Sequence, residues 1–158
     1  MCSIFKIKTM SIKFNSIYGF IIGLALIVYF LFMRMFNLET FVELRFLNLA
    51  IVLGGMYWMY YNLFKKQPGV HTYFEGIASG VQAVLIATLT LVVFLQAFMY
   101  FNPDFIQSIN DRGLWGQDMT VITMGFVIGF EGFFSGFLLS YLMMQFFKPY
   151  TKSAMYHS

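Results

Sequence analysis

The chain has 158 residues, of which 59% are hydrophobic, 21% aromatic and only 11% charged. Soluble domains carry roughly 25% charged residues, so this composition excludes an ordinary water-soluble globule and a disordered polar chain. The net charge of +3 is the balance of 10 Lys and Arg residues against 7 Asp and Glu residues. The basic residues form no cluster dense enough to follow nucleic-acid phosphates. The sequence therefore predicts an all-α integral membrane protein whose main partner is the lipid bilayer, with no nucleic acid bound.

Long apolar stretches occupy more than half of the chain. The transmembrane helices predicted from them cover about residues 17–33, 44–64, 76–101 and 121–147. Each is long enough, or nearly so, to cross a hydrocarbon core of ~30 Å. Because an unpaired backbone amide costs several kcal/mol in lipid, such stretches must be helical. We therefore expect residues 1–158 to form a single membrane domain, a four-transmembrane-helix bundle.

Polar and helix-breaking residues separate these stretches. Arg34 follows the first stretch, and Pro68, which disfavours the α conformation at the preceding residue, follows the second. Pro103, within Asn102-Pro103-Asp104, ends the third stretch for the same steric reason. The chain is therefore expected to leave the membrane at each of these points.

Basic residues lie mainly on one side of the predicted bundle. That side holds Lys6, Lys8, Lys13, Lys65, Lys66, Lys148 and Lys152. The opposite side holds Arg34, Arg45 and Arg112. Under the positive-inside rule, this asymmetry predicts a multi-pass membrane protein with both termini in the cytoplasm.

An aromatic cluster lies near the inner end of the second stretch, at Tyr57, Trp58, Tyr60 and Tyr61. Tyr and Trp collect at membrane–water interfaces, so we interpret the cluster as an interfacial belt. A ligand-stacking site is the alternative interpretation.

Glycines recur at the spacing that lets membrane helices approach closely. The pairs are Gly19 and Gly23, Gly76 and Gly80, Gly125 and Gly129, and Gly132 and Gly136. The last four share one helical stripe, because their spacing of four, three and four residues returns to the same face. This stripe predicts a tight interface within the bundle; a homodimer or a contact with another membrane protein is the alternative.

Glu131 is the ionisable residue deepest inside a predicted span. It lies about 15 Å along the helix that begins at Val121, close to the middle of the bilayer. A charged carboxylate there costs about 3 kcal/mol. We therefore expect Glu131 to be buried against other helices, neutral or paired, with Thr88, Thr90 and Ser135 as candidate partners.

Two interpretations of Glu131 remain open. It is either a neutral acid that holds helices together through hydrogen bonds, or a carboxylate that couples protons or cations to transport. We favour the structural interpretation, because transporters usually bring further buried charges or a broken helix to the site.

Patterns typical of catalysis and metal binding are missing from the sequence. His71 and His157 have no partner acid at metal-ligand spacing, and Cys2 is the single cysteine. No phosphate-binding loop, nucleophile elbow or zinc-binding helix motif occurs. The sequence thus predicts no enzyme, cofactor or metal, but a structural or interaction component of the membrane. A small proton- or cation-coupled transporter or channel using Glu131 is the alternative, and an intramembrane enzyme acting on lipids has the least support.

Three motifs resemble those of a known family. They are His71-Thr72-Tyr73-Phe74-Glu75-Gly76 with Gly80, Asn102-Pro103-Asp104-Phe105, and Glu131-Gly132-Phe133-Phe134-Ser135-Gly136. Over roughly residues 15–148 the chain resembles the small bacterial membrane proteins grouped as "domain of unknown function 4199". The resemblance implies the bacterial inner (plasma) membrane and no established activity, so it brings no catalytic residues.

Overall fold

The computed structural model describes residues 2–36, 45–65, 71–102, 104 and 120–151; of residues 2–12, 45 and 46 it describes the backbone alone. Within these ranges every regular element is helical. The elements are α1 (Cys2–Met35), α2 (Arg45–Tyr60), the π-helical η2 (Tyr61–Lys65), α3 (Tyr73–Phe101), α5 (Val121–Phe147) and the 3₁₀ turn η3 (Lys148–Tyr150). η2 continues α2 directly, and η3 continues α5.

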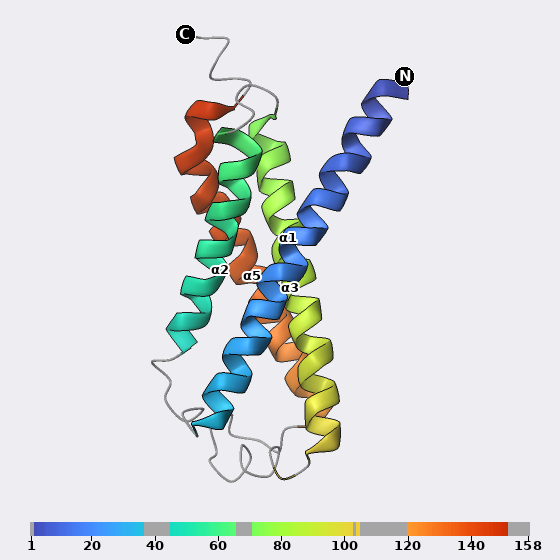
Figure 1. The fold of residues 1–158 in the computed structure, drawn as a ribbon, viewed down its shortest axis with the longest axis vertical. Coiled ribbons are helices and arrows are strands. Elements are labelled where there is room, and N and C mark those ends of the chain that lie inside the picture. Colours follow the sequence, from blue (N-terminus) through green and yellow to red (C-terminus); the bar gives the residue numbers. More distant parts are fainter. Residues whose placement is uncertain (1, 37–44, 66–70, 103, 105–119, 152–158) are drawn as a thin grey trace.

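The long helices run alternately in opposite directions, so that α1 begins and α5 ends at the same end of the molecule (Figure 1). α3 makes the most extensive contacts, with α1 and with α5, while α2 packs mainly against α1. α1 crosses α3 obliquely, and its first turns point away from the other helices (Figure 1). α3 is therefore the helix against which the others are positioned.

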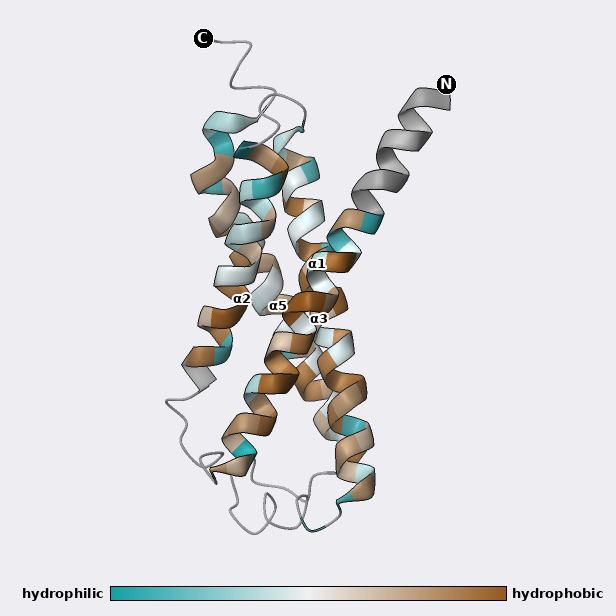
Figure 2. Cartoon of the chain, in the orientation of Figure 1, coloured by the Kyte–Doolittle hydropathy of each residue, from teal (hydrophilic) through white to brown (hydrophobic). Residues whose placement is uncertain are grey.

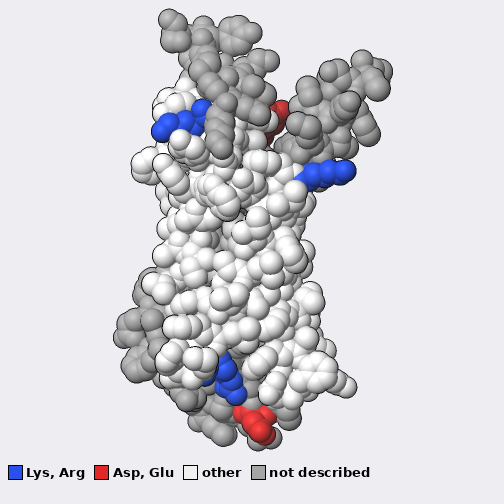
Figure 3. All heavy atoms as spheres, in the orientation of Figure 1, with Lys and Arg blue, Asp and Glu red and all other residues white. Residues whose placement is uncertain are grey.

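Among the described residues, three helices have the length and apolar composition needed to cross a membrane. They are Lys13–Met35, Tyr73–Phe101 and Val121–Tyr150. Large apolar side chains on them are exposed, including Val93 (65%), Phe126 (74%) and Phe130 (67%). Apolar residues follow most of their length in Figure 2, and in Figure 3 the charged side chains of the face shown lie toward the two ends. Apolar surface of this extent is rare on soluble monomers, so this all-helical protein suits a bilayer.

The stretch predicted as the second span, 44–64, corresponds to α2 followed by η2. α2 has 16 residues and η2 has 5, so each alone is shorter than the ~20 residues of a typical span. A side-chain hydrogen bond accompanies the change of helix type. Asn62 Nδ2 donates a hydrogen bond of 2.9 Å to the Trp58 carbonyl, the acceptor that the Asn62 backbone N–H would use in an α-helix.

The starts of α1 and α3 differ from the expected ones. α1 begins at Cys2 rather than near residue 17, because no Gly or Pro interrupts the chain before Gly19. α3 begins at Tyr73 because Thr72 and Glu75 form a capping box. Thr72 N donates to Glu75 Oε2 at 2.8 Å, and Glu75 N donates to Thr72 Oγ1 at 3.4 Å. Two otherwise unpaired N–H groups are satisfied in this way.

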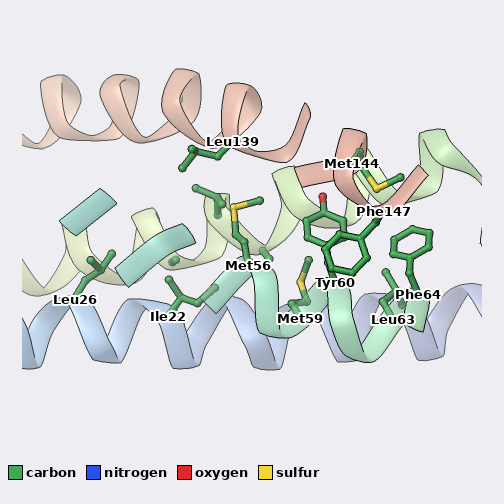
Figure 4. Close-up of a cluster of buried hydrophobic side chains, with 13 residues drawn as sticks. Ile22, Leu26, Met56, Met59, Tyr60, Leu63, Phe64, Leu139, Met144 and Phe147 are labelled. Atoms are coloured by element: carbon green, nitrogen blue, oxygen red, sulfur yellow. The ribbon is translucent and has the colours of Figure 1, made fainter. Parts of the chain in front are cut away.

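The best-packed part of the molecule lies where α2 and η2 meet the start of α3 and the end of α5 (Figure 4). Tyr60 and Phe64 are fully buried and Phe147 is 4% exposed. Their three ring centroids lie 5.7, 5.9 and 6.3 Å apart. The Tyr60 hydroxyl donates to the Gly76 carbonyl at 2.9 Å, so the polar end of this buried ring is satisfied. These rings join α2, α3 and α5.

The interfacial-belt interpretation is wrong for Tyr60. Tyr57 and Trp58 are about half exposed, at 52% and 54%, whereas Tyr60 is fully buried. Tyr60 shares a helical face with Met56 and Phe64, four residues before and after it, and this face points into the core.

Glycines allow the helices to approach one another at several of the expected positions. Gly19 and Gly23 of α1 lie against α3, and Gly76 and Gly80 of α3 lie against side chains of α2, η2 and α5.

On α5, three of the four striped glycines face α3. A Cβ placed on Gly132 would lie 2.5 Å from Thr88 Oγ1, and one on Gly136 would lie 2.5 Å from Val84 Cγ1. Gly125 lies against the Gln96 side chain. Gly129 differs, because a Cβ there would meet nothing within 4 Å. The close approach of α3 and α5 therefore uses Gly125, Gly132 and Gly136, and α3 has no side chain opposite Gly129.

Candidate functional site

A cleft of ≈ 270 Å³ lies beside the middle of α5 and is lined by residues of α1, α2, α3 and α5. Its polar groups come from Asn48, Thr88, Glu131 and Ser135, and most of its other lining residues are Leu, Val and Ile. Buried residues such as Thr88 form its floor, whereas Glu131 and Leu49 are exposed at its rim. The cleft is thus an apolar recess with a few polar groups, the usual composition of a small-molecule site.

The expected burial of Glu131 is not observed, because its side chain is exposed at the cleft. The reason is the geometry of α5. At about 100° per residue, Glu131 lies roughly 130° around the helix from the centre of the glycine stripe. When Gly132 and Gly136 face α3, Glu131 cannot face α3 as well, and it points instead into the space beside α2.

Two of the three expected partners share the cleft with Glu131. Ser135 Oγ donates to the Gly132 carbonyl at 3.2 Å, which leaves the hydroxyl oxygen free to accept. Thr88 lies against Gly132, the residue next to Glu131 in sequence. Thr90 lies elsewhere. Its hydroxyl donates to the Ile86 carbonyl at 2.7 Å, and its side chain packs beside Gly23 of α1. The structure therefore brings together Glu131, Thr88 and Ser135.

The electrostatics of the cleft are those of a single carboxylate. Among the described residues that line it there is no Lys, Arg or His. Within the described ranges, no residue forms an ion pair or hydrogen bond with the Glu131 carboxylate. A carboxylate among apolar side chains favours a positively charged occupant.

The packed aromatic core lies beyond one end of this cleft. Along α2 the cleft residues end at Val52, and Tyr60 follows eight residues later, about 12 Å further along the helix. Along α5 the cleft ends at Leu139, and Phe147 lies the same distance beyond it. The core thus lies between the cleft and the end of the molecule at which α1 begins.

Sequence reasoning missed a second polar contact, between α1 and α3. Asn15 is 2% exposed, and its Nδ2 donates to Gln82 Oε1 at 3.2 Å. Asn15 Oδ1 is buried and has no hydrogen-bond partner in the described part of the chain. Asn15 was overlooked because it precedes the first apolar stretch. Asn15 lies one turn before Gly19 and two turns before Ile22, on the face of α1 that contacts α3. This spacing is the feature of the sequence that could have identified Asn15.

His71 lies two residues before the first residue of α3, outside the apolar helices. Its ring makes an edge contact with Phe64, with the centroids 5.8 Å apart. Burial lowers the pKa of His71 below its ordinary value of 6.5, and the Glu75 carboxylate opposes this by raising it. His71 is therefore held in its neutral form at neutral pH.

The described residues include no group of three or more His, Cys, Asp or Glu side chains able to hold a metal ion. Among the described lining residues, the cleft combines the Glu131 carboxylate with the hydroxyls of Thr88 and Ser135 and the amide of Asn48. Comparison of the chain with protein families, curated proteins and solved structures found no match.

Proposed function

We propose that the chain is an integral membrane protein that crosses the bacterial inner membrane four times, with both termini in the cytoplasm. Three apolar helices support membrane insertion, and α2 with η2 supplies the remaining span. The start of α1 and the end of α5 lie at one end (Figure 1), as an even number of crossings requires. The Lys-rich segments determine which end faces the cytoplasm. Membership of the family with which the chain shares three motifs is part of this proposal.

We further propose that the protein belongs to the interaction class and holds another molecule in the cleft beside Glu131. This proposal rests on one observation. Glu131 is exposed in a recess in the middle of an apolar bundle, and no described residue forms a hydrogen bond or ion pair with it. An acid that only held helices together would be buried against them. Its exposure to the cleft favours a role in binding.

Modification by an apolar carbodiimide tests this proposal. Dicyclohexylcarbodiimide dissolves in the bilayer and reacts with carboxyl groups that are accessible there. In native membranes we expect mass spectrometry to find the adduct on Glu131, and no adduct at this position in Glu131→Gln. A bound molecule would shield Glu131, so the purified protein in detergent is treated as well; absence of the adduct from both samples would contradict an open cleft.

Stability separates the binding role from the structural one. Since Glu131 has no described partner, we expect Glu131→Gln to change the free energy of unfolding by less than about 0.5 kcal/mol. If the carboxyl group were hydrogen-bonded across helices, the same substitution would lower the free energy of unfolding by more than about 1 kcal/mol. A large loss would support the structural role.

A proton- or cation-coupled transporter is the second candidate, and the exposure of Glu131 favours it as well. Proton and potassium flux into liposomes containing the purified protein distinguishes the two. The binding function predicts no flux above that of empty liposomes, because a molecule held in the cleft is not carried across the membrane. Flux that is lost in Glu131→Gln would establish the transporter instead.

A further inference from the structure

We infer that the occupant of the cleft is a small amphiphilic monocation, a protonated amine attached to a short apolar body. The inference rests on the proposed function, because it assumes that the cleft holds another molecule. It adds the chemical class of that molecule.

The charge of the occupant follows from the charge of the cleft. Of the described residues that line the cleft, Glu131 alone is ionisable. A carboxylate in apolar surroundings is strongly unfavourable unless a positive charge compensates it. The carboxylate would repel an anion. A neutral apolar molecule would displace water from the carboxylate without supplying a hydrogen-bond donor in its place. One positive charge matches the one negative charge.

The hydrogen-bonding groups match an ammonium group. Besides the Glu131 carboxylate, the cleft offers the hydroxyl of Ser135, whose own hydrogen is donated to the Gly132 carbonyl. Thr88 adds a second hydroxyl and Asn48 an amide oxygen. An ammonium group has three donors and no acceptor, so acceptors are what it needs.

The apolar lining indicates that the charge is carried by a molecule with a hydrocarbon part. Leu26, Val52, Val84 and Leu139 come from four different helices and surround the polar groups. A bare alkali cation would lose its hydration shell against these side chains, and a divalent cation requires more oxygen and carboxylate ligands than the cleft holds. A hydrocarbon chain gains free energy from the same surface.

The size of the cleft limits the body of the amine. Ligand sites usually have volumes of roughly 300–1,000 Å³, and this cleft, at ≈ 270 Å³, is near the lower limit. The expected occupant is therefore a short-chain amine rather than a whole lipid. The exposed rim at Leu49 and Glu131 lets such a molecule enter without opening the core.

Binding of octylammonium to the full-length protein in maltoside micelles tests the inference, with octanol as the neutral probe of equal length and potassium chloride as the inorganic cation. Isothermal titration calorimetry at neutral pH reads the dissociation constants. We expect octylammonium to bind about tenfold or more tightly than octanol, and potassium not to compete with it. Equal binding of the two octyl probes, or displacement of octylammonium by millimolar potassium, would overturn the inference.

Two variants identify the site. Glu131→Gln should weaken octylammonium binding about tenfold or more while leaving octanol binding unchanged. Leu49→Trp keeps the carboxylate but fills the cleft from an exposed position, so that it should abolish binding of both probes without disturbing the fold. Unchanged octylammonium binding in both variants would show that the amine binds elsewhere.

The carbodiimide experiment distinguishes the two levels of the proposal. If Glu131 is modified in membranes but octylammonium binds no better than octanol, the cleft is open and the inferred ligand class is wrong. If Glu131 is modified neither in membranes nor in the purified protein, the binding function fails, and the inference fails with it.

Discussion

Gly132 and Gly129 lie one turn apart on α5 and allow a direct test of how α3 and α5 pack. Replacement of either glycine by Ala removes the same backbone freedom and gains up to about 1 kcal/mol in helix propensity. The two sites differ in their surroundings. A Cβ on Gly132 would lie 2.5 Å from both Oγ1 and Cγ2 of Thr88, whereas a Cβ on Gly129 would meet nothing within 4 Å.

The overlap of a Cβ at Gly132 with Thr88 cannot be relieved by a small movement of the Thr88 side chain. Thr88 is β-branched and 9% exposed on a central helix, so its side chain cannot rotate freely away. Overpacking of this kind costs about 1–3 kcal/mol. Because the propensity gain is common to both variants, we expect Gly132→Ala to be less stable than Gly129→Ala by about 1–3 kcal/mol, with Gly129→Ala at or above the wild-type stability.

Equilibrium unfolding of the purified proteins in mixed micelles, followed by circular dichroism, measures this difference. Gly136→Ala, whose Cβ would lie 2.5 Å from Val84 Cγ1, should behave like Gly132→Ala. Equal stability of the Gly129 and Gly132 variants would refute the described contact between α3 and α5. A loss in Gly129→Ala that depends on protein concentration would instead locate the homodimer interface at Gly129.

Three further predictions concern the end of the bundle at which α3 begins and α5 ends. Tyr60→Phe removes the hydrogen bond to Gly76 and should lower the unfolding free energy by about 1 kcal/mol, with no change in the carbodiimide reactivity of the cleft; unchanged stability would contradict the contact. Thr72→Ala removes the α3 cap and should cost about 0.5–2 kcal/mol in the same measurement, and Thr72→Ser should restore most of it. An NMR titration should find the pKa of His71 below 6.5, and lower still in Glu75→Gln. The folded state binds the proton less readily than the unfolded state. The free energy of unfolding should therefore fall as the pH drops through about 6.5, and it should level off below the folded-state pKa of His71. A His71 pKa at or above 6.5 would contradict the burial of its ring.

Composition and the long apolar stretches were sufficient to predict the helical class of the described residues, whereas four membrane crossings stay a prediction. The described residues are all-helical, and three helices have the length and apolarity of membrane spans. Local rules also explain details such as the start of α3, where the Thr72 and Glu75 pair is readable in the sequence as a capping box. The π-helical turn at Tyr61–Lys65 was not predicted, because no pattern of residue types in the sequence marks it.

Which face of a helix meets which neighbour was harder to predict. The depth of Glu131 follows from counting residues, but its exposure depends on how α5 is rotated when its glycines meet α3. Thr88 and Thr90 were both expected as partners of Glu131, yet they are about 200° apart around α3. Of the two, Thr88 alone lines the cleft. Tyr60 was assigned to the membrane interface by residue type, although its helical face lies in the core. Such outcomes depend on tertiary packing, which a single sequence does not specify.

The central claim, that the helices cross a membrane with the Lys-rich end inside, is tested most directly by cysteine labelling in intact cells. In a Cys2→Ser background, Phe74→Cys and Lys148→Cys lie at that end, and Asp104→Cys and Thr120→Cys at the other; all four positions are exposed. A membrane-impermeant maleimide should label Asp104→Cys and Thr120→Cys in intact cells, and the other two only after the membrane is permeabilised. Labelling of Phe74→Cys in intact cells, or protection of Thr120→Cys, would contradict this topology.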